Sequence, residues 1–470
     1  MRASKVGVLV LILGFGATVE TAWHARNHFG VGPWDWQVLT GDKFSGPSFQ
    51  FEDMEAQVVP EGTPVEIENS FGGVRAVMGA PGEVKIVLRK VVYRRNEQEA
   101  EAFAGRLRLT RALEGGALRI NTNRREVEAG QDGHHRIGFE THLEVTLPPG
   151  TRLKVQNEHG ATEVADVAEA RVWGSYEPIR VERVAGVAEV SSRHGDVTVA
   201  DVKGALNLDA QHGGVDIRQI GGKATLDVEH GDVTANEVGG LDLKLRQGDL
   251  SADGIMGDLE VAGEHAGVRA VAVTGRVVVE TGYKDVQVER VGGDVRLVSK
   301  HGDVRAADIA GAVYAESRYK DVELARIAGP AEVRVMHGGV QAQGLEKGAL
   351  IRTAGDDVII DGFRGGLDIQ AERGSVRLRP SVAVTEAINV RVTNGGIEMD
   401  VPEGSRFTLD ASAVRGEVVA EVAGFTALQS GPLRVTGTMG GGGSTVNLSA
   451  EGANVELRSA ATITTDSGPR

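Results

Sequence analysis

The sequence has 470 residues, of which 65 are glycine, 41% are hydrophobic and only 4% are aromatic. This composition supplies few large side chains for a thick globular core and favours a thin, layered core of aliphatic residues. The net charge of -15, with no cluster of Lys and Arg, excludes nucleic acid as the main partner, and the absence of cysteine excludes disulfides and thiolate metal sites.

An apolar run near the N-terminus predicts that the protein is exported. Arg2 and Lys5 precede a largely apolar segment from Val6 to Val19, an arrangement typical of a signal sequence. The run is shorter than the roughly 20 residues that a membrane-spanning helix prefers, yet no clear Ala-x-Ala cleavage site follows it. Residues 1–22 are therefore interpreted as a signal peptide or, if uncleaved, as a membrane anchor.

Residues 23–50 are interpreted as a linker, and their three tryptophans fit a membrane interface as well as a partly ordered lead-in. Residues 51–150 are expected to form a small β-rich N-terminal part. It contains a first coil at 64–74, whose Phe71 matches the corner position of the later repeats. Further strands are expected at 84–88, 118–120 and 143–147, and one short helix is expected near 96–109.

From Gly186 onward a unit of about eighteen residues repeats along the chain. Each unit has an alternating strand, a corner of the type His-Gly-Asp-Val, a second alternating strand and a return to glycine. The corner column contains His194, His212, His230, Tyr283, His301, Tyr319 and His337, and it extends backward to Tyr176 and His159 and forward through Gly355, Arg373, Asn394 and Arg415. This pattern predicts about fifteen coils and, at roughly 4.7–4.9 Å between neighbouring strands, a rod on the order of 70 Å long.

Apolar and polar residues alternate with period two inside each unit, which is the pattern of a strand with one buried face. Val190, Leu208 and Leu226 occupy one inward column, and Val197, Val215 and Val233 occupy a second. The predicted fold is therefore all-β, a single-stranded β-solenoid (β-helix) with coils of about 18 residues and with glycines at corners that need positive φ. Residues 151–430 are assigned to the solenoid repeats, 431–458 to C-terminal coils or a cap, and 459–470 to a disordered tail.

Two further features connect this pattern to a known family. Val59-Pro-Glu-Gly-Thr63 and Leu147-Pro-Pro-Gly-Thr151 each lead into an alternating strand that ends in a glycine-rich corner, and Gly-Asp-Val corners recur. In these motifs residues 50–460 resemble the bacterial putative-adhesin β-repeat family, a domain of unknown function related to the GIN autotransporter adhesin head domain. The resemblance implies a β-solenoid at the cell envelope with an adhesive role, and it supplies no catalytic residues. The His column departs from the family pattern, which has small polar residues before the Gly-Asp.

Seven histidines lie in the corner column: His159, His194, His212, His230, His265, His301 and His337. Imidazoles stacked about one strand spacing apart would suit a metal-binding or pH-sensing ladder, with His194, His212, His230, His301 and His337 as its members. A structural stack is favoured instead, because Tyr176, Tyr283 and Tyr319 keep a planar ring but do not replace imidazole in a zinc site. The column is also in phase with the inward positions, which predicts that its rings cover the edge of the core. No metal site is therefore assigned.

Aspartates two residues after the corner position admit a calcium-binding interpretation, as in parallel β-rolls: Asp196, Asp232, Asp249, Asp285, Asp303, Asp321 and Asp357. The Gly-Gly-x-Gly-x-Asp nonapeptide of those rolls is absent. Because Asp in a tight turn more often bonds its own neighbouring backbone, a structural role is favoured. His134 and His135 are interpreted as part of an exposed polar loop.

The sequence lacks a Gly-x-Ser-x-Gly elbow, a His-Glu-x-x-His motif and a phosphate-binding loop. We therefore predict a non-enzymatic protein with no catalytic residues and no cofactor. The predicted role is adhesion by an exported protein of the periplasm or cell surface, whose elongated face binds a glycan or cell-surface ligand by multivalent contacts. Arg269, Arg296, Arg305 and Glu323 are the candidate contacts. Two alternatives stay open: a periplasmic structural scaffold or signalling domain, and a polysaccharide-active β-helix enzyme.

Overall fold

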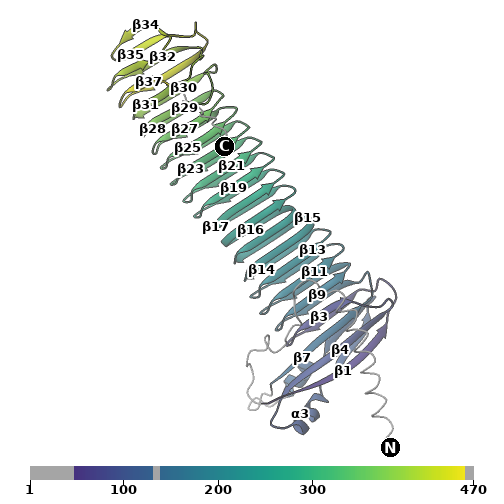
Figure 1. Ribbon diagram of the computed structural model, residues 1–470. Helices are drawn as coiled ribbons and strands as arrows, with labels where there is room; N and C mark the ends of the chain where they lie inside the picture. The colour runs from purple at the N-terminus through teal and green to yellow at the C-terminus, as the bar shows by residue number, and fades with distance from the viewer. Residues whose placement is uncertain (1–46, 131–137, 461–470) are drawn as a thin grey trace, which may run out of the picture.

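The computed structural model describes residues 47–130 and 138–460, and over these residues the protein is a long rod of stacked strands (Figure 1). The two helices of this part, α3 (Glu97–Ala104) and α4 (Arg124–Ala129), both lie near the N-terminal end of the rod. Among the described residues, no helix has the length and apolar character needed to cross a membrane. The predictions for the apolar N-terminal run, for the linker up to residue 46, for His134 and His135 and for residues 461–470 of the tail fall outside the described residues.

The regular part of the rod runs from β8 (Arg152–Asn157) to β31 (Ile397–Val401) and makes about 14 turns of about 18 residues. Each turn contributes one strand to a first face and one strand to a second face. Three long strands, β15 (Val215–His230), β16 (Val233–Ile255) and β17 (Leu259–Val273), pass from one face to the other without a break. The β-solenoid predicted from the sequence is therefore confirmed.

The remaining strands of the regular part divide between the two faces. The first face contains β8, β10 (Glu169–Gly174), β12 (Ala188–Ser192), β14 (Leu206–His212), β18 (Val277–Thr281), β20 (Val295–Ser299), β22 (Val313–Ser317), β24 (Ala331–Val335), β26 (Ala349–Thr353), β28 (Leu367–Arg373) and β30 (Ile388–Asn394). The second face contains β9 (Thr162–Val167), β11 (Ile179–Val184), β13 (Val197–Val202), β19 (Val286–Val291), β21 (Val304–Ile309), β23 (Val322–Ile327), β25 (Val340–Leu345), β27 (Val358–Phe363), β29 (Val376–Pro380) and β31.

Neighbouring turns pair in parallel and in register. Val190 lies opposite Leu208, and Leu208 lies opposite Leu226, as the predicted inward column requires. On the second face, Val197 lies opposite Val215. Because each coil repeats the same alternation, the same positions point inward in every turn.

Aliphatic side chains from both faces fill the rod as one continuous core. In β13, Val197, Val199 and Val202 are at most 1% exposed, whereas Thr198 between them is partly exposed. Burying a side chain of this kind contributes about 1.5–3 kcal/mol. The thin core predicted from the composition is thus built from many small contributions, one set in each coil.

A residue in the left-handed conformation bends the chain near the end of most second-face strands. At Asp201, for example, φ is 53°, and this kink lets Val199 and Val202 both point inward although they are three residues apart. The sequence predicted that glycine supplies the positive φ at the corners, and Gly160, Gly213, Gly231 and Gly248 do so at the corner of the ring column. The kink at the end of the second-face strands was not predicted, and nine of its positions have other residues: Asp166, Arg183, Asp201, Gln219, Glu237, Ala272, Arg290, Asp308 and Arg326. Glycine takes the equivalent place at 254, 344 and 362.

Several corner glycines are required for a different reason, the close approach of neighbouring coils. A Cβ atom on Gly302 would lie 2.0 Å from the carbonyl oxygen of Lys284 in the preceding coil. A Cβ atom on Gly204 would lie 2.5 Å from the carbonyl oxygen of Gly186. Because no side chain fits into these gaps, glycine recurs with the period of the coil.

The N-terminal end of the rod is closed by antiparallel strands. The first coil, β2 (Val65–Asn69) and β3 (Val74–Met78), pairs with β8 and β9 on its inner side. On its outer side it pairs with β6 (Ala117–Thr122) and β7 (Phe139–Leu147). Antiparallel strands then extend both faces. On the first face, β5 (Leu109–Glu114) pairs with β6. On the second face, β4 (Glu83–Tyr93) pairs with β7, and β1 (Ser48–Val58) pairs with β4.

The strands expected at 84–88, 118–120 and 143–147 are therefore confirmed within β4, β6 and β7. The expected helix is present as α3, which begins after Asn96, whose side chain accepts a hydrogen bond from the Glu99 amide at 2.9 Å. Sequence analysis did not predict α4, and it did not predict β1.

At the C-terminal end, the order of the coils in space differs from their order in the sequence. The segment that comes last in the chain, β36 (Ser444–Ala450) and β37 (Val455–Ser459), lies between the coil of β30 and β31 and the coil of β32 (Phe407–Ala413) and β33 (Val418–Glu421). The expectation that the Arg415 coil follows the Asn394 coil directly is therefore wrong.

A hairpin of β34 (Phe425–Gly431) and β35 (Arg434–Met439) packs antiparallel to β32 and closes this end (Figure 1, yellow). A parallel coil with nothing beyond it would present unpaired backbone groups to other chains. The inserted coil and the hairpin together cover the edge that would otherwise be open.

Candidate functional site: the ring ladder and the hollows of the first face

Planar rings stack along one edge of the rod, where each turn passes from the first face to the second. This ring ladder consists of Phe71, His159, Tyr176, His194, His212 and His230, and then, beyond Gln247, of His265, Tyr283, His301, Tyr319 and His337. Neighbouring ring centroids lie 4.4–5.4 Å apart, and beyond Phe71 the planes are within 22° of parallel. Because this spacing follows that of neighbouring strands, the predicted structural stack is confirmed.

The rings of the ladder face water, which corrects the prediction that they cover the edge of the core. Tyr176 is 49% exposed and Tyr283 is 53% exposed. The residue that points inward at this corner is two positions earlier, as at Ser192, whose hydroxyl donates to the Gly195 carbonyl at 2.8 Å. The strand ends at Ser192, so the turn removes the alternation that had predicted an inward ring at His194.

The geometry of the ladder does not direct its histidines at a common point. His194, His212 and His230 stack face to face, with centroids 5.1 and 4.9 Å apart. In such a stack the ring nitrogens of neighbours lie side by side at the ring edges. Within residues 47–130 and 138–460, no group of three or more His, Asp or Glu residues has a geometry that could hold a metal ion. His301 stacks between Tyr283 and Tyr319, and His337 stacks on Tyr319.

The corner aspartates join neighbouring coils. In each of them one carboxylate oxygen accepts the backbone N–H of the equivalent corner in the next coil: Asp196, Asp232, Asp249, Asp285, Asp303, Asp321 and Asp357. The bond from Gly214 to Asp196 is 2.8 Å long, and that from Ser375 to Asp357 is 2.7 Å. The sequence predicted a structural role but placed the bond within the same turn. The structure instead uses these carboxylates to hold successive coils together.

The outward side chains of the first face form two columns along the rod, and two hollows lie in them. The first, which we call the Trp173 hollow, has a volume of about 580 Å³, and the second, the Tyr314 hollow, has a volume of about 690 Å³. Residues that line the Trp173 hollow include Lys154, Trp173, Ser191, Asn207, Asp209 and Asp227. Those of the Tyr314 hollow include Arg296, Tyr314, Glu332, Lys347, Leu350 and Asp368.

The polar groups of the Tyr314 hollow hold one another. The guanidinium carbon of Arg296 lies 4.4 Å from the centre of the Tyr314 ring, and that of Arg334 lies 5.6 Å from it. The Tyr314 hydroxyl donates to Glu316 at 2.6 Å. Partial burial, and then the hydrogen bond to Glu316, raise the pKa of Tyr314 above its ordinary value. The phenol therefore stays protonated and fixed between two arginines.

The Trp173 hollow combines an aromatic ring with facing carboxylates. Trp173, Ser191, Asp209 and Asp227 succeed one another in register on four neighbouring strands. The guanidinium carbon of Arg193 lies 5.8 Å from the centre of the indole ring. Partial burial, and then the neighbouring carboxylate of Asp227, raise the pKa of Asp209. The hollow therefore offers an apolar ring face next to acceptor oxygens.

The four contacts that the sequence nominated do not form one surface. Arg269 and Arg305 lie in one column of the second face, where Arg305 forms an ion pair with Glu323 at 3.2 Å. Arg296 lies on the first face, in the Tyr314 hollow. Sequence reasoning missed Trp173 and Tyr314, although the signal was present, because each is a large aromatic residue at an outward position of an alternating strand.

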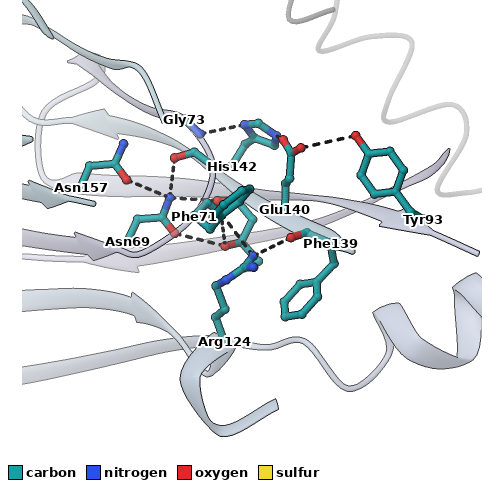
Figure 2. A network of polar contacts seen from close by, with 11 residues as sticks. Asn69, Phe71, Gly73, Tyr93, Arg124, Phe139, Glu140, His142 and Asn157 are labelled. Carbon is teal, nitrogen blue, oxygen red and sulfur yellow. Dashed lines mark hydrogen bonds and ion pairs between the residues drawn. The ribbon is translucent and has the colours of Figure 1, made fainter. Parts of the chain in front are cut away.

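A buried polar network fixes the N-terminal strands to the first coil (Figure 2). The side-chain amide of Asn69 donates to the carbonyls of Gly72 and Thr141, at 2.7 and 3.0 Å. His142 accepts the Gly73 amide proton on Nδ1 at 2.9 Å, and its Nε2 lies 3.1 Å from a carboxylate oxygen of Glu140. These groups join β2, β3 and β7 within the cap.

Arg124 of α4 completes this network. Its guanidinium lies 4.0 Å from the Phe139 ring and 4.8 Å from the Phe71 ring, and it donates to the Phe139 carbonyl at 2.8 Å. Burial lowers the pKa of Arg124, which the ion pair with Glu128 at 2.7 Å opposes. Because these groups bind one another and Phe71 begins the ring ladder, we interpret the network as the structural base of the rod.

Comparison with known proteins gives a family for this chain. The family model described as Toastrack DUF4097 matches residues 94–263 and 257–458. No curated protein matches the sequence. A solved structure titled a putative cell adhesion protein from Clostridium sporogenes ATCC 15579 is 8% identical and covers 87% of this chain and 100% of its own, but its TM-score of 0.15 supports no conclusion. The expected relation to the GIN head domain stays a prediction. Because the two matches span most of the chain, this protein belongs to the Toastrack DUF4097 family.

Proposed function

We propose that this protein is a non-enzymatic rod of the bacterial cell envelope that binds another surface through weak contacts repeated along its length. The observation that carries the proposal is the rod itself, in which outward side chains form straight columns over about 14 turns. Contacts along such a column act together, so the avidity of the rod exceeds the affinity of any one contact. The adhesive role implied by the family resemblance is consistent with this geometry.

The polar clusters of the rod support a non-enzymatic role. The carboxylates of the corners bind backbone amides, and the network of Asn69, Glu140 and His142 is buried and bound to its own cap. The turns between strands of the regular part are short, as between Ser192 and Val197, so they build no deep walls around the hollows. A polysaccharide-active enzyme would need such walls to exclude water from a reacting bond.

Both ends of the rod are closed by antiparallel strands, which disfavours a scaffold that grows by stacking rods end to end. Export is a part of the proposal that rests on the apolar run from Val6 to Val19. If that run is uncleaved, it would hold the rod at a membrane.

The test is protease treatment of intact cells that produce the protein, followed by mass spectrometry of the released peptides, with a periplasmic protein as the control for cell integrity. Release of peptides from residues 150–400 while the control stays intact supports adhesion at the surface. If these peptides are released only after the outer barrier is opened, adhesion to other surfaces is refuted and a periplasmic scaffold or signalling domain replaces it. A second assay measures whether the purified full chain binds to intact cells.

A further inference from the structure

We propose that the Trp173 hollow binds a neutral, unbranched glycan that lies along the axis of the rod. This inference rests on the proposed adhesive function and adds the class of ligand and its place on the molecule. Three observations carry it: a pair of like charges that the fold does not require, a set of polar groups without protein partners, and an aromatic ring beside them.

The like charges are Asp209 and Asp227, which lie directly opposite each other on neighbouring strands. At many other places on the rod, charges on neighbouring coils are complementary, as where Arg183 binds Asp166 at 2.8 Å. Like charges are also directly opposed at Asp242 and Glu260 and at Arg334 and Arg352, but there Asp242 binds Lys223 and Arg334 binds Glu332. Like charges at directly opposed positions destabilise a sheet. An arrangement that lowers stability and forms no contact that the fold needs is expected at a functional site.

The polar groups of the hollow are available to a ligand. Over the described part of the chain, no hydrogen bond or ion pair engages the side chains of Ser191, Asn207, Asp209 or Asp227. In the Tyr314 hollow, by contrast, Glu316 already holds the phenol. Sugar hydroxyls can donate to the two carboxylates and accept from the Asn207 amide, so a glycan supplies the missing partners.

The ring of Trp173 supplies the apolar part of the site. The small side chain of Ser191 stands next to it in register. The Arg193 guanidinium lies 5.8 Å from the centre of the indole ring, so a sugar ring would pack on the part of the indole that Arg193 does not cover. The C–H face of a sugar ring would pack on the indole while its hydroxyls reach toward Asp209. Successive positions lie about 4.8 Å apart along the rod, close to the length of one hexose unit in an extended chain. A straight glycan therefore keeps its register over several coils.

The hollow is poorly suited to other polymers. The backbone groups of these strands are paired on both sides, so an extended peptide has no free edge to join. The charges are nearly balanced, which favours a neutral ligand over a polyanion or a polycation. They are the cations Lys154, Arg171 and Lys244 and the carboxylates Glu189, Asp209, Asp227 and Asp242.

The test is titration calorimetry of the full chain with neutral β-1,4-linked hexasaccharides of glucose and of N-acetylglucosamine, and with a galacturonic acid hexamer as the anionic probe. We expect a neutral hexasaccharide to bind with a Kd below about 1 mM, and more tightly than the trisaccharide of the same sugar. Trp173→Ala should weaken binding by about tenfold or more. The matched control is Tyr176→Ala, which removes an exposed ring from the same coil outside the hollow and should leave the affinity unchanged.

A second variant separates binding from folding. Asp209→Ser with Asp227→Ser removes the like-charge pair, so it should raise the melting temperature and still weaken glycan binding. Failure of both neutral hexasaccharides to bind, preference for the galacturonic acid hexamer, or equal binding by Trp173→Ala would each overturn the glycan site. If the full chain nevertheless binds intact cells, the adhesive function stands and only its ligand is wrong. If the chain binds neither cells nor saccharides, both proposals fall.

Discussion

Replacing Gly302 by Ala tests whether the coils are packed as closely as the structure shows. The new Cβ would lie 2.0 Å from the carbonyl oxygen of Lys284, whereas an ordinary C···O contact is about 3.3 Å or longer. The corner must therefore shift by more than about 1 Å. The shift would break the bond from His301 to the Gly282 carbonyl, 3.0 Å, and the bond from Asp303 to Asp285, 2.9 Å.

The expected cost follows from these contacts. Two hydrogen bonds contribute about 1 kcal/mol each, and the disturbed stacking of His301 adds about 0.5–1.5 kcal/mol. The free energy of local unfolding should thus fall by about 3 kcal/mol. Gly214→Ala is the control, because its Cβ would meet nothing closer than 3.7 Å, and it should stay within about 0.5 kcal/mol of the parent.

Hydrogen exchange measured by mass spectrometry on peptides from residues 282–320 is the suitable assay, since a solenoid can open locally without unfolding as a whole. Gly302→Ala should speed exchange in these peptides, whereas Gly214→Ala should leave exchange unchanged in the peptides around its own corner, residues 196–232. Equal protection in the two variants would refute the claim that glycine is required by the close approach of coils.

Three other changes test separate parts of the fold. Ala272→Gly should stabilise the protein by about 0.5–1 kcal/mol in urea unfolding. Ala272 has a φ of 56°, which costs an ordinary residue about 1–2 kcal/mol, and the greater freedom of glycine in the unfolded chain offsets part of that gain. An unchanged or lower stability would contradict this. Asp209→Asn should raise stability at pH 7, because the raised pKa of the Asp209 carboxyl means that the folded state disfavours its charge. This gain should vanish as the pH falls below the ordinary pKa of Asp. A gain that persists at pH 3 would show another cause. A chain that ends at Gly440 lacks β36 and β37 but keeps β35, the antiparallel partner of β32, so the loss of protection from hydrogen exchange is expected at β33, residues 418–421, whose strand partner is β37. Retained protection at residues 418–421 would mean that β33 docks directly on β31.

The repeat could be predicted from the sequence because every coil buries one face of its strands and therefore shows the same alternation of apolar and polar residues. Val190, Leu208 and Leu226 fall into one column when the coils are aligned by their period, and the structure pairs these residues in register. The order of the C-terminal coils could not be predicted in this way. The strand at 446–450 has the same alternation as its neighbours, so the pattern alone does not tell which strands it separates.

The orientation of the ring ladder escaped prediction for a more local reason. Period two holds only while the chain is extended, and the strand that precedes His194 ends at Ser192. Beyond that residue the turn decides where a side chain points, and it directs the rings outward. The same limit applies to the corner aspartates, whose bonds to the next coil depend on the stacking of coils and not on the turn itself.

In a repeat protein the requirements of the fold recur in every coil, so residues that break a column are the ones that the fold does not explain. Inward aliphatic residues and corner glycines recur along the rod, and the corner aspartates recur in many of its coils. Trp173 and the pair of Asp209 and Asp227 occur at single places in their column, where neighbouring coils have residues of other kinds. The opposed carboxylates of Asp209 and Asp227 cost stability, and in the described part of the chain no hydrogen bond or ion pair engages either of them. A ligand that recognises one stretch of an otherwise regular rod would have to use such residues, which is why the Trp173 hollow is the place to look for it.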